Sequence, residues 1–275
     1  MAGRIRSGIH LPFSIPNQKK NPFCHSFIIA LIPKRNSLDC SAEPLLWVDI
    51  LYSSCLSMNV TPPPSKEDIM LTARGEVRLR SFCKSDNIRE YKLDSEFTAS
   101  GGYKPLYTQK ESLAAQAQRP KTNLVLALAS PQTIIGFGVL AYPESGERWA
   151  ELGAGVMMEV KAIEVARSWR RADIASRILK LVVDYPQIED KIFYMVGYSW
   201  TWDLEGTQKT AQAYRAMLVH LFEGQGVQVF ETNEPNVCLK PENVLMCRLG
   251  NNISRETKDR FKWLRFGLRP WAWNV

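Results

Sequence analysis

The stretch 160–179 combines features that together could bind an anion: a strand, the adjacent Arg170 and Arg171, and the start of a helix. β-Branched residues fill the strand part, and apolar residues recur with helical spacing from Ile174 onward. The first turn of a helix exposes backbone N–H groups that have no partner within the helix, and the helix dipole favours negative charge there. Because two cations flank this helix start, the sequence predicts a site for an anionic group such as a phosphate.

Two glutamates on the strand of this stretch could accept a proton in a reaction. Strict strand alternation would divide the strand into two faces, with Glu159, Lys161, Ile163 and Val165 on one and Val160, Ala162 and Glu164 on the other. We therefore expect only one of the two glutamates to face a substrate. The alternative, which the sequence leaves open, is that either glutamate only pairs with a surface lysine.

Two tryptophans, Trp200 and Trp202, lie two residues apart in a segment that reads as extended, so their side chains are expected to point the same way. Core packing is the default interpretation of such a pair. Asp203 beside them suggests instead a rim that could grip a protein substrate.

Composition and residue usage argue against several classes of function. The 275 residues carry a net charge of +7, with 45% hydrophobic and 23% charged residues, as in an ordinary soluble globular protein. No clustered basic stripe is present, so nucleic-acid binding is not expected. The six cysteines form no CxxC pair and no metal-like spacing with histidine, which favours a reduced, cytoplasmic protein without a metal.

Two further features are interpreted as structural. His220, the one histidine after residue 57, lies in an apolar helical run and reads as a packed or surface residue. The glycine motif at 152–155 lacks a third glycine and a following helix, so it reads as a turn and not as a dinucleotide site.

Residues 1–57 differ from the rest of the chain. Their two apolar bursts are too short to span a bilayer, and Lys34 and Arg35 follow the first burst instead of preceding it, unlike a signal peptide. We expect this part to be either a disordered extension or upstream sequence read from a mis-assigned start, with Met58 as the true beginning. The functional domain is expected over 58–275.

The remaining pattern predicts alternating strands and helices. Strands are expected over 71–82, 124–129, 134–142, 160–165, 192–198, 227–231 and 244–249. Helices are expected over 86–97, 109–118, from 174 to a stop at Pro186, over 207–223, and over 254–266 with Ser254 as N-cap.

The anion-binding stretch resembles the acyl-CoA-binding motif of the GCN5-related N-acetyltransferases, which runs Gln/Arg, any, any, Gly, any, Gly/Ala. Here the motif reads RRADIA at 170–175, with Val165 at the family's strand valine. Asp173 departs from the family, which has a glycine there. Its carboxylate is expected in the first turn of the helix, where it would satisfy free N–H groups when the site is empty and would repel the pyrophosphate when it is filled.

Further segments resemble the acetoin-utilisation acetyltransferases of bacilli, over residues 70–266. The matching segments are ERW at 147–149, AIEV at 162–165, YSWTWDL at 198–204, AYR at 213–215, TNEPNVCLKPENVLMCRLGNNIS at 232–254 and LRF at 264–266. The resemblance implies an α/β (α+β) acetyltransferase fold, with a mixed, mostly antiparallel sheet and helices on both faces.

The resemblance also implies a reaction, in which an acetyl group passes from acetyl-CoA to a protein lysine. Members of this family inactivate AMP-forming acetyl-CoA synthetase by acetylating a lysine in its active site. The motif assigns to the coenzyme the residues Ile163, Val165, Arg170, Arg171, Ala172, Asp173, Ile174 and Ala175. Backbone N–H groups at 163–165, where the central strand should separate from its neighbour, could also stabilise the oxyanion.

Two residues are candidates for the proton transfers. Glu159 lies where histone-type members of the superfamily carry their base, so we favour it over Glu164. Tyr214 lies in the helix where many acetyltransferases place a tyrosine that protonates the thiolate. The usual glycine follows that tyrosine closely, whereas here Gly226 is twelve residues later, so core packing of Tyr214 is an equal alternative.

Two other functions remain compatible with the sequence. One is acetylation of a small amine, which a deep acidic pocket would favour. The other is a protein that binds acyl-CoA without catalysis. The departures from the family pattern at Asp173 and around Tyr214 are compatible with such a sensor. Neither a nucleic acid nor a membrane is expected as a partner.

Overall fold

The computed structural model describes residues 63–98, 107–129 and 132–270. The chain divides into two compact units, Met1–Asn59 and Val60–Val275, and all described residues belong to the second. The expectations for residues 1–57 lie outside the described residues. None of the described helices is both long enough and apolar enough to cross a membrane.

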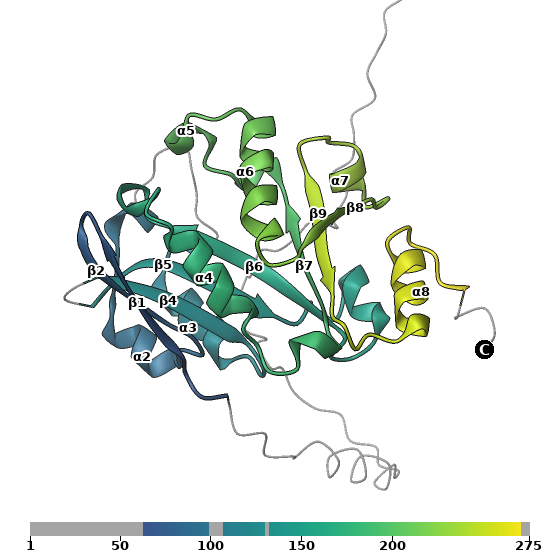
Figure 1. The fold of residues 1–275 in the computed structure, drawn as a ribbon, viewed down its shortest axis with the longest axis horizontal. Helices are drawn as coiled ribbons and strands as arrows, with labels where there is room; N and C mark the ends of the chain where they lie inside the picture. The colour runs from purple at the N-terminus through teal and green to yellow at the C-terminus, as the bar shows by residue number, and fades with distance from the viewer. Residues whose placement is uncertain (1–62, 99–106, 130–131, 271–275) are drawn as a thin grey trace, which may run out of the picture. The chain divides into compact units, whose positions relative to one another are not determined.

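Among the described residues, nine strands form one mixed sheet (Figure 1). The strands are β1 (Glu67–Thr72), β2 (Gly75–Arg80), β3 (Lys92–Leu93), β4 (Asn123–Ala129), β5 (Thr133–Ala141), β6 (Met157–Val165), β7 (Ile192–Gly197), β8 (Gln228–Phe230) and β9 (Val244–Leu249). Their order across the sheet is β1-β2-β4-β5-β6-β7-β9-β8, and β3 pairs with β5 off this path. Only the β6–β7 and β3–β5 pairs are parallel, so the sheet is mostly antiparallel as the sequence predicts.

Helices cover both faces of this sheet. The helices are α2 (Ser85–Glu90), α3 (Lys110–Gln118), α4 (Ile174–Val183), α5 (Leu204–Thr207), α6 (Ala211–Glu223), α7 (Pro235–Cys238) and α8 (Arg255–Leu264). Buried residues of α4 and α6 share one core cluster with the sheet, whereas α2 and α3 pack into a second cluster and α8 into a third. Neighbouring residues of β4 and β5 alternate between the first two clusters, which places α4 and α6 on one face and α2 and α3 on the other.

Helix α4 packs closely on the centre of the sheet because β5 carries a glycine beneath it. A Cβ atom at Gly138 would lie 2.5 Å from Cγ2 of Ile178 and 2.6 Å from Cγ2 of Val182. The apolar stripe predicted from the sequence supplies the buried face of the helix, since Ile174, Ile178 and Val182 are all fully buried. This packing fixes the height of the helix start above the sheet.

Most predicted elements are confirmed, but three are divided. The strand expected over 71–82 is a hairpin, because Gly75 adopts φ +117° and turns the chain between β1 and β2. The helix expected over 86–97 ends at Glu90, and β3 and a short 3₁₀ turn follow it. The helix expected over 207–223 begins as α5 and restarts as α6, where the Thr210 side chain accepts from the Ala213 N–H. Ser254 caps α8 as predicted.

The alternation expected along the central strand is wrong, because β6 contains a bulge. Val139 pairs with Ala162 and Leu140 pairs with Val160, so Lys161 is an extra residue between them. Directly paired residues share a face, and the bulge therefore reverses the alternation beyond residue 161. Glu159 and Glu164 both lie on the face of α2 and α3, and the opposite face carries Val160, Ile163 and Val165.

Candidate active site

The two parallel strands at the centre of the sheet separate after three residue pairs. Met157, Met158 and Glu159 of β6 pair with β7, and the last partner on β7 is Tyr194. From residue 160 to 165, β6 pairs only with β5, and no described strand covers its other edge. This edge lies beside the segment from Ile163 to Val165, where the sequence predicts the separation, and Arg170 Nε donates there to the Val165 carbonyl at 3.0 Å.

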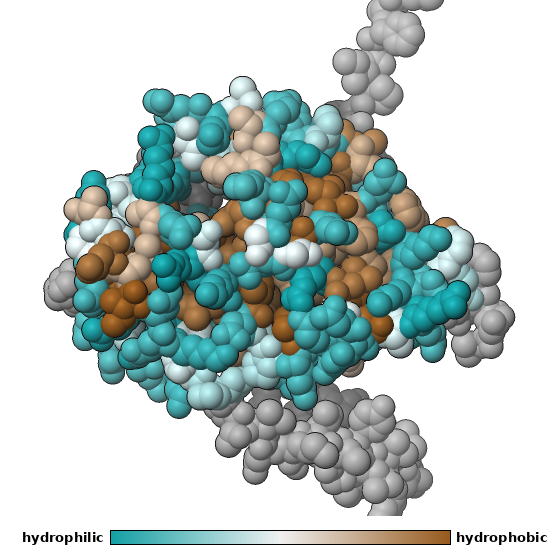
Figure 2. All heavy atoms as spheres, viewed as in Figure 1, coloured by the Kyte–Doolittle hydropathy of each residue, from teal (hydrophilic) through white to brown (hydrophobic). Residues whose placement is uncertain are grey.

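Hydrophobic side chains surround this separation. On the face drawn in Figure 2 they gather between α4 and α6, over the strands that diverge there. Those from β6 and α6 are partly buried against the core, namely Ile163, Leu218, Val219 and Leu221. An apolar wall of this kind suits the aliphatic arm of an acyl carrier.

The loop between β6 and α4 contains two left-handed residues and leads directly into the helix. Arg171 and Asp173 both adopt left-handed conformations, with φ of 66° and 59°. The first hydrogen bond of α4 runs from Arg177 N to Asp173 O at 3.2 Å, so the three preceding helical N–H groups have no acceptor within the helix. The loop thus places a helix start at the open edge of β6, as the sequence predicts.

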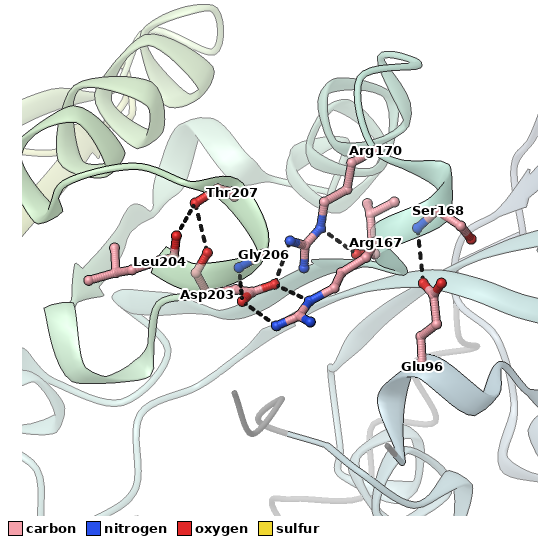
Figure 3. Close-up of polar contacts among 9 residues, drawn as sticks. Glu96, Arg167, Ser168, Arg170, Asp203, Leu204, Gly206 and Thr207 are labelled. Carbon is pink, nitrogen blue, oxygen red and sulfur yellow. Dashed lines mark hydrogen bonds and ion pairs between the residues drawn. The ribbon is translucent and has the colours of Figure 1, made fainter. Parts of the chain in front are cut away.

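Two arginines of this loop converge on one buried carboxylate, that of Asp203 (Figure 3). Arg167 donates to both oxygens, from Nε to Oδ2 at 2.8 Å and from Nη2 to Oδ1 at 2.7 Å. Arg170 donates from Nη1 to Oδ2 at 2.6 Å and from Nε to the Val165 carbonyl at 3.0 Å. These hydrogen bonds hold the pKa of Asp203 at about 2 despite its burial. Arg170, assigned to the coenzyme by its motif, is therefore also part of an internal ion pair.

Glu159 lies at the point where β6 and β7 begin to separate. Its side chain is 20% exposed and accepts from Lys161 Nζ at 2.7 Å, so the pairing with a lysine that the sequence left open is present. Lys161 is itself only 13% exposed, and it also lies 3.8 Å from Glu147 and 4.0 Å from Glu144. Burial raises the pKa of Glu159, and the charge of Lys161 partly offsets this. A raised pKa suits a general base that works near neutral pH.

Tyr214 packs against the aromatic ring of Trp202, with the ring centroids 5.0 Å apart and the planes at 13°. Burial raises the pKa of Tyr214 to about 12, the nearby charge of Glu164 acts in the same direction, and the charge of Arg170 partly offsets both. The phenol therefore stays protonated at neutral pH. Glu164 and Tyr214 are brought near each other, whereas Glu159 lies further back along the same strand.

The rim expected from the two tryptophans is wrong in its details. Ser199–Thr201 forms a 3₁₀ turn, so the segment is not extended, and the rings of Trp200 and Trp202 stack on different partners. Trp200 is 51% exposed and stacks on Tyr198, with Lys240 Nζ 5.0 Å from its ring centroid. Asp203 is buried in the ion pair described above and cannot contact a partner directly.

The capping role expected for Asp173 is also wrong. Asp173 is the N-cap residue of α4, but its side chain makes no capping hydrogen bond. The carboxylate is 66% exposed and lies 3.9 Å from Arg177. The backbone explains why the family motif has a glycine at this position, which adopts φ 59° here. Glycine adopts this conformation freely, and aspartate tolerates it better than most residues do.

Sequence reasoning missed the buried role of Asp203 and the lysine–carboxylate cluster around Lys161. Arg167 and Asp203 are 36 residues apart, so no local pattern joins them. Ser168 likewise donates its backbone N–H to Glu96 Oε2 at 3.0 Å, across 72 residues. One sequence feature could have indicated this contact: the loop carries three arginines close together. A partly buried arginine needs a carboxylate partner, which must then come from elsewhere in the chain.

Two interpretations of other residues are confirmed. His220 is exposed on α6, and the glycine motif at 152–155 forms a turn in which Gly153 and Gly155 both have positive φ. Among the described residues, no group of three or more histidine, cysteine, aspartate or glutamate side chains is arranged to hold a metal ion.

Comparison with known proteins agrees with this geometry. The chain is 33% identical over 198 residues to the acetoin utilization protein AcuA of Bacillus licheniformis, covering 72% of this chain and 92% of that protein. The identity to AcuA of Bacillus subtilis is 31% over 195 residues, covering 71% of this chain and 91% of that protein. The chain belongs to the AcuA family. No protein-family model matches it.

A solved structure supports the same assignment. The crystal structure of an acetoin utilization protein from Exiguobacterium sibiricum matches with a TM-score of 0.69 and 26% sequence identity, covering 76% of this chain and 97% of that one. With the separated parallel strands and the loop before α4, AcuA membership identifies this chain as an N-acetyltransferase with the GCN5-related fold. The alternative that the chain is a non-catalytic acyl-CoA sensor is therefore set aside.

Proposed function

We propose that the chain transfers the acetyl group of acetyl-CoA to the ε-amine of a lysine in AMP-forming acetyl-CoA synthetase and thereby inactivates that enzyme. The observation that carries the proposal is the separation of β6 from β7 beyond Glu159, with the loop 170–175 at its open end. The resemblance of the chain to acetoin-utilisation acetyltransferases supports the identity of the protein substrate. The proposal includes a cytoplasmic setting and requires no metal.

The proposed coenzyme site extends along the open edge of β6. The pyrophosphate would lie at the loop and the start of α4, from Arg170 to Ala175, where helical N–H groups have no internal acceptor. The thioester would lie beside Ile163 and Val165, whose strand segment is not covered by β7. Backbone N–H groups there would stabilise the oxyanion of the tetrahedral intermediate.

The proposed chemistry moves one proton to a base and one to the thiolate. Glu159 accepts the proton of the lysine ammonium, directly or through a water, and the neutral amine attacks the thioester carbon. The intermediate collapses by breaking its C–S bond, and Tyr214 can donate a proton to the leaving thiolate. The second proton that the attacking nitrogen must lose then returns to the Tyr214 phenolate, directly or through a water. The products are the acetylated lysine and coenzyme A.

Incubation of the purified protein with acetyl-CoA and an AMP-forming acetyl-CoA synthetase tests this function. We expect thiol release, one acetylated lysine in the active site of the synthetase by mass spectrometry, and loss of synthetase activity. A synthetase that stays unmodified and fully active after long incubation would contradict the proposed substrate.

One feature favours a second candidate, the acetylation of a small amine. Glu144, Glu147 and Glu159 lie around Lys161, and Arg119 also pairs with Glu144. Three carboxylates against these two cations leave an excess of negative charge that would attract an amine. Thiol release with free diamines, in the absence of any protein acceptor, would distinguish this function from the first.

A further inference from the structure

The carboxylate of Asp203 has every acceptor position filled from two separate parts of the chain. Arg167 and Arg170 come from the loop after β6, and the fourth hydrogen bond comes from Gly206 N at 2.9 Å within the connection after β7. The side chain of Asp203 is 1% exposed, whereas those of Arg167 and Arg170 are 39% and 22% exposed. The two arginines therefore reach inward to a carboxylate that cannot turn to solvent.

This ion pair joins the loop after β6 to the connection after β7, beyond the point where the two strands separate. Strands β6 and β7 last pair at Glu159 and Tyr194, and the bridge joins the segments that follow their ends. Figure 3 shows the two arginines on one side of this bridge and the turn carrying Asp203 on the other. The bridge therefore joins the connection after β7 to the coenzyme loop.

The residue before Asp203 contacts the candidate acid. The ring of Tyr214 stacks on that of Trp202, with the ring centroids 5.0 Å apart. The Thr207 hydroxyl donates to the Asp203 carbonyl at 2.7 Å and completes the turn. The side chain of Asp203 thus holds the coenzyme loop, while the turn that it anchors carries Trp202, on which the tyrosine stacks.

We propose that Asp203 is a positioning residue for the acetyl transfer, which fixes the loop 167–175 in its coenzyme-binding geometry and sets Tyr214 against the thioester end of the same coenzyme. The inference rests on the proposed function only for the identity of the coenzyme. Asp203 itself does not touch a ligand, because its oxygens are already occupied.

Gly206 lies so close to the ion pair that a substitution there can disturb it without removing any charge. A Cβ atom at Gly206 would lie 2.3 Å from Asp203 Oδ2 and 2.4 Å from Arg167 Nε. Gly206→Ala must therefore displace the ion pair without removing any of its members. Gly146→Ala is the matched control, since a Cβ there has no neighbour within 4 Å.

Calorimetric titration of coenzyme A into the full-length protein measures the effect without an acceptor. Gly206→Ala should raise the Kd about tenfold at both low and high salt, the weight of a displaced charge-assisted hydrogen bond. Asp203→Asn should raise the Kd at high salt and less at low salt, where the two released arginines attract the anionic coenzyme. Asp184→Asn, which removes an ion pair with Lys66 at the other end of α4, should leave the Kd unchanged.

The double variant and the thermal midpoints distinguish a positioning role of Asp203 from a role in stabilising the fold alone. If Asp203 and Gly206 act as one unit, Asp203→Asn with Gly206→Ala should raise the Kd no more than the worse single change. A purely structural role would lower the thermal midpoint of both variants and leave their Kd within twofold of the wild type, and this result would overturn the proposal. So would the failure of both variants to fold. Absence of synthetase acetylation by a wild-type chain that binds coenzyme A would overturn the proposed substrate alone.

Discussion

The choice between two glutamates is a question at the scale of single residues. Because of the bulge at Lys161, Glu159 and Glu164 lie on the same face of β6, so facing alone no longer decides which is the base. Glu159 has a raised pKa and lies at the start of the strand separation, whereas Glu164 lies near Tyr214 and acts on its pKa. These environments favour Glu159 as the base.

Glu159→Gln should lower kcat by about 10²–10⁴-fold, the usual contribution of a general base, and leave the Kd for coenzyme A unchanged. In the wild type, kcat should fall as the pH drops through the raised pKa of Glu159, since only the carboxylate accepts a proton. Steady-state kinetics from pH 5 to 9 should show this acid limb in the wild type and lose it in the variant. A loss of this size in Glu164→Gln, with Glu159→Gln unaffected, would reverse the assignment.

Asp173 is the other residue whose role the structure redefines. Because its carboxylate caps nothing and its backbone is left-handed, Asp173→Gly should not destabilise the protein and should raise the free energy of unfolding by at most about 1 kcal/mol. Loss of the negative charge should also tighten coenzyme A binding, most clearly at low salt.

Asp173→Asn separates the two effects, since asparagine also tolerates this backbone but carries no charge. Denaturant unfolding and titration calorimetry on both variants make the comparison. If neither variant binds coenzyme A more tightly at low salt, the carboxylate points away from the phosphates.

At this scale the sequence predicted which residues gather at the site better than how they contact one another. The loop 170–175 and the glutamates were identifiable from residue type and spacing. The bulge at Lys161 was not, because a bulge depends on the partner strand β5 and leaves no mark in the alternation of β6 itself. The ion pair of Asp203 with Arg167 and Arg170 depends on a long-range contact, which periodicity does not reveal.

At the scale of elements, the position of α4 on β5 determines where the coenzyme loop lies. Gly138→Ala would bring a Cβ within 2.6 Å of both Ile178 and Val182, so the helix must move away from the sheet. We expect a loss of about 1–3 kcal/mol in the free energy of unfolding, as for other overpacked cores. The displaced helix start should also weaken coenzyme A binding.

Gly146→Ala serves again as the control, because its site is open. Denaturant unfolding gives the stability change, and calorimetry on the folded variants gives the Kd. A Gly138→Ala protein that loses stability but binds coenzyme A as the wild type does would show that the loop is held by Asp203 and not by the height of α4.

Element boundaries were predicted well where a helical or strand period was long and poorly where a turn interrupted it. The hairpin of β4 and β5 and the helices α3, α4 and α8 follow their patterns within a few residues. The β1–β2 turn was missed, because one glycine in an otherwise alternating stretch reads equally well as a strand interior. The helix predicted from Thr207 begins only at Ala211, because Gln208 adopts φ 52° and ends α5 before Thr210 caps α6.

At the scale of the whole molecule, the carboxylates of Asp203 and Glu159 act on stability in opposite directions with pH. The pKa of Asp203 is lowered in the folded state, so its contribution is complete above its unfolded pKa and is lost as the pH falls toward about 2. The pKa of Glu159 is raised, so its contribution is complete below its unfolded pKa and is lost as the pH rises through the folded pKa. Acid unfolding should therefore report on the Asp203 bridge and not on Glu159.

The expected size follows from the shift of the Asp203 pKa from 3.8 to about 2, which corresponds to roughly 1–2 kcal/mol after allowance for water screening around the partly exposed Arg167. Between pH 6 and pH 3, the free energy of unfolding of the wild type should fall more steeply than that of Asp203→Asn, whose side chain does not titrate. Denaturant unfolding of both proteins over this range measures the two slopes, with Asp184→Asn as a control for an exposed ion pair. Equal slopes in the wild type and Asp203→Asn would mean that the two arginines do not stabilise the ionised carboxylate, and the bridge between the two halves of the site would then have no energetic basis.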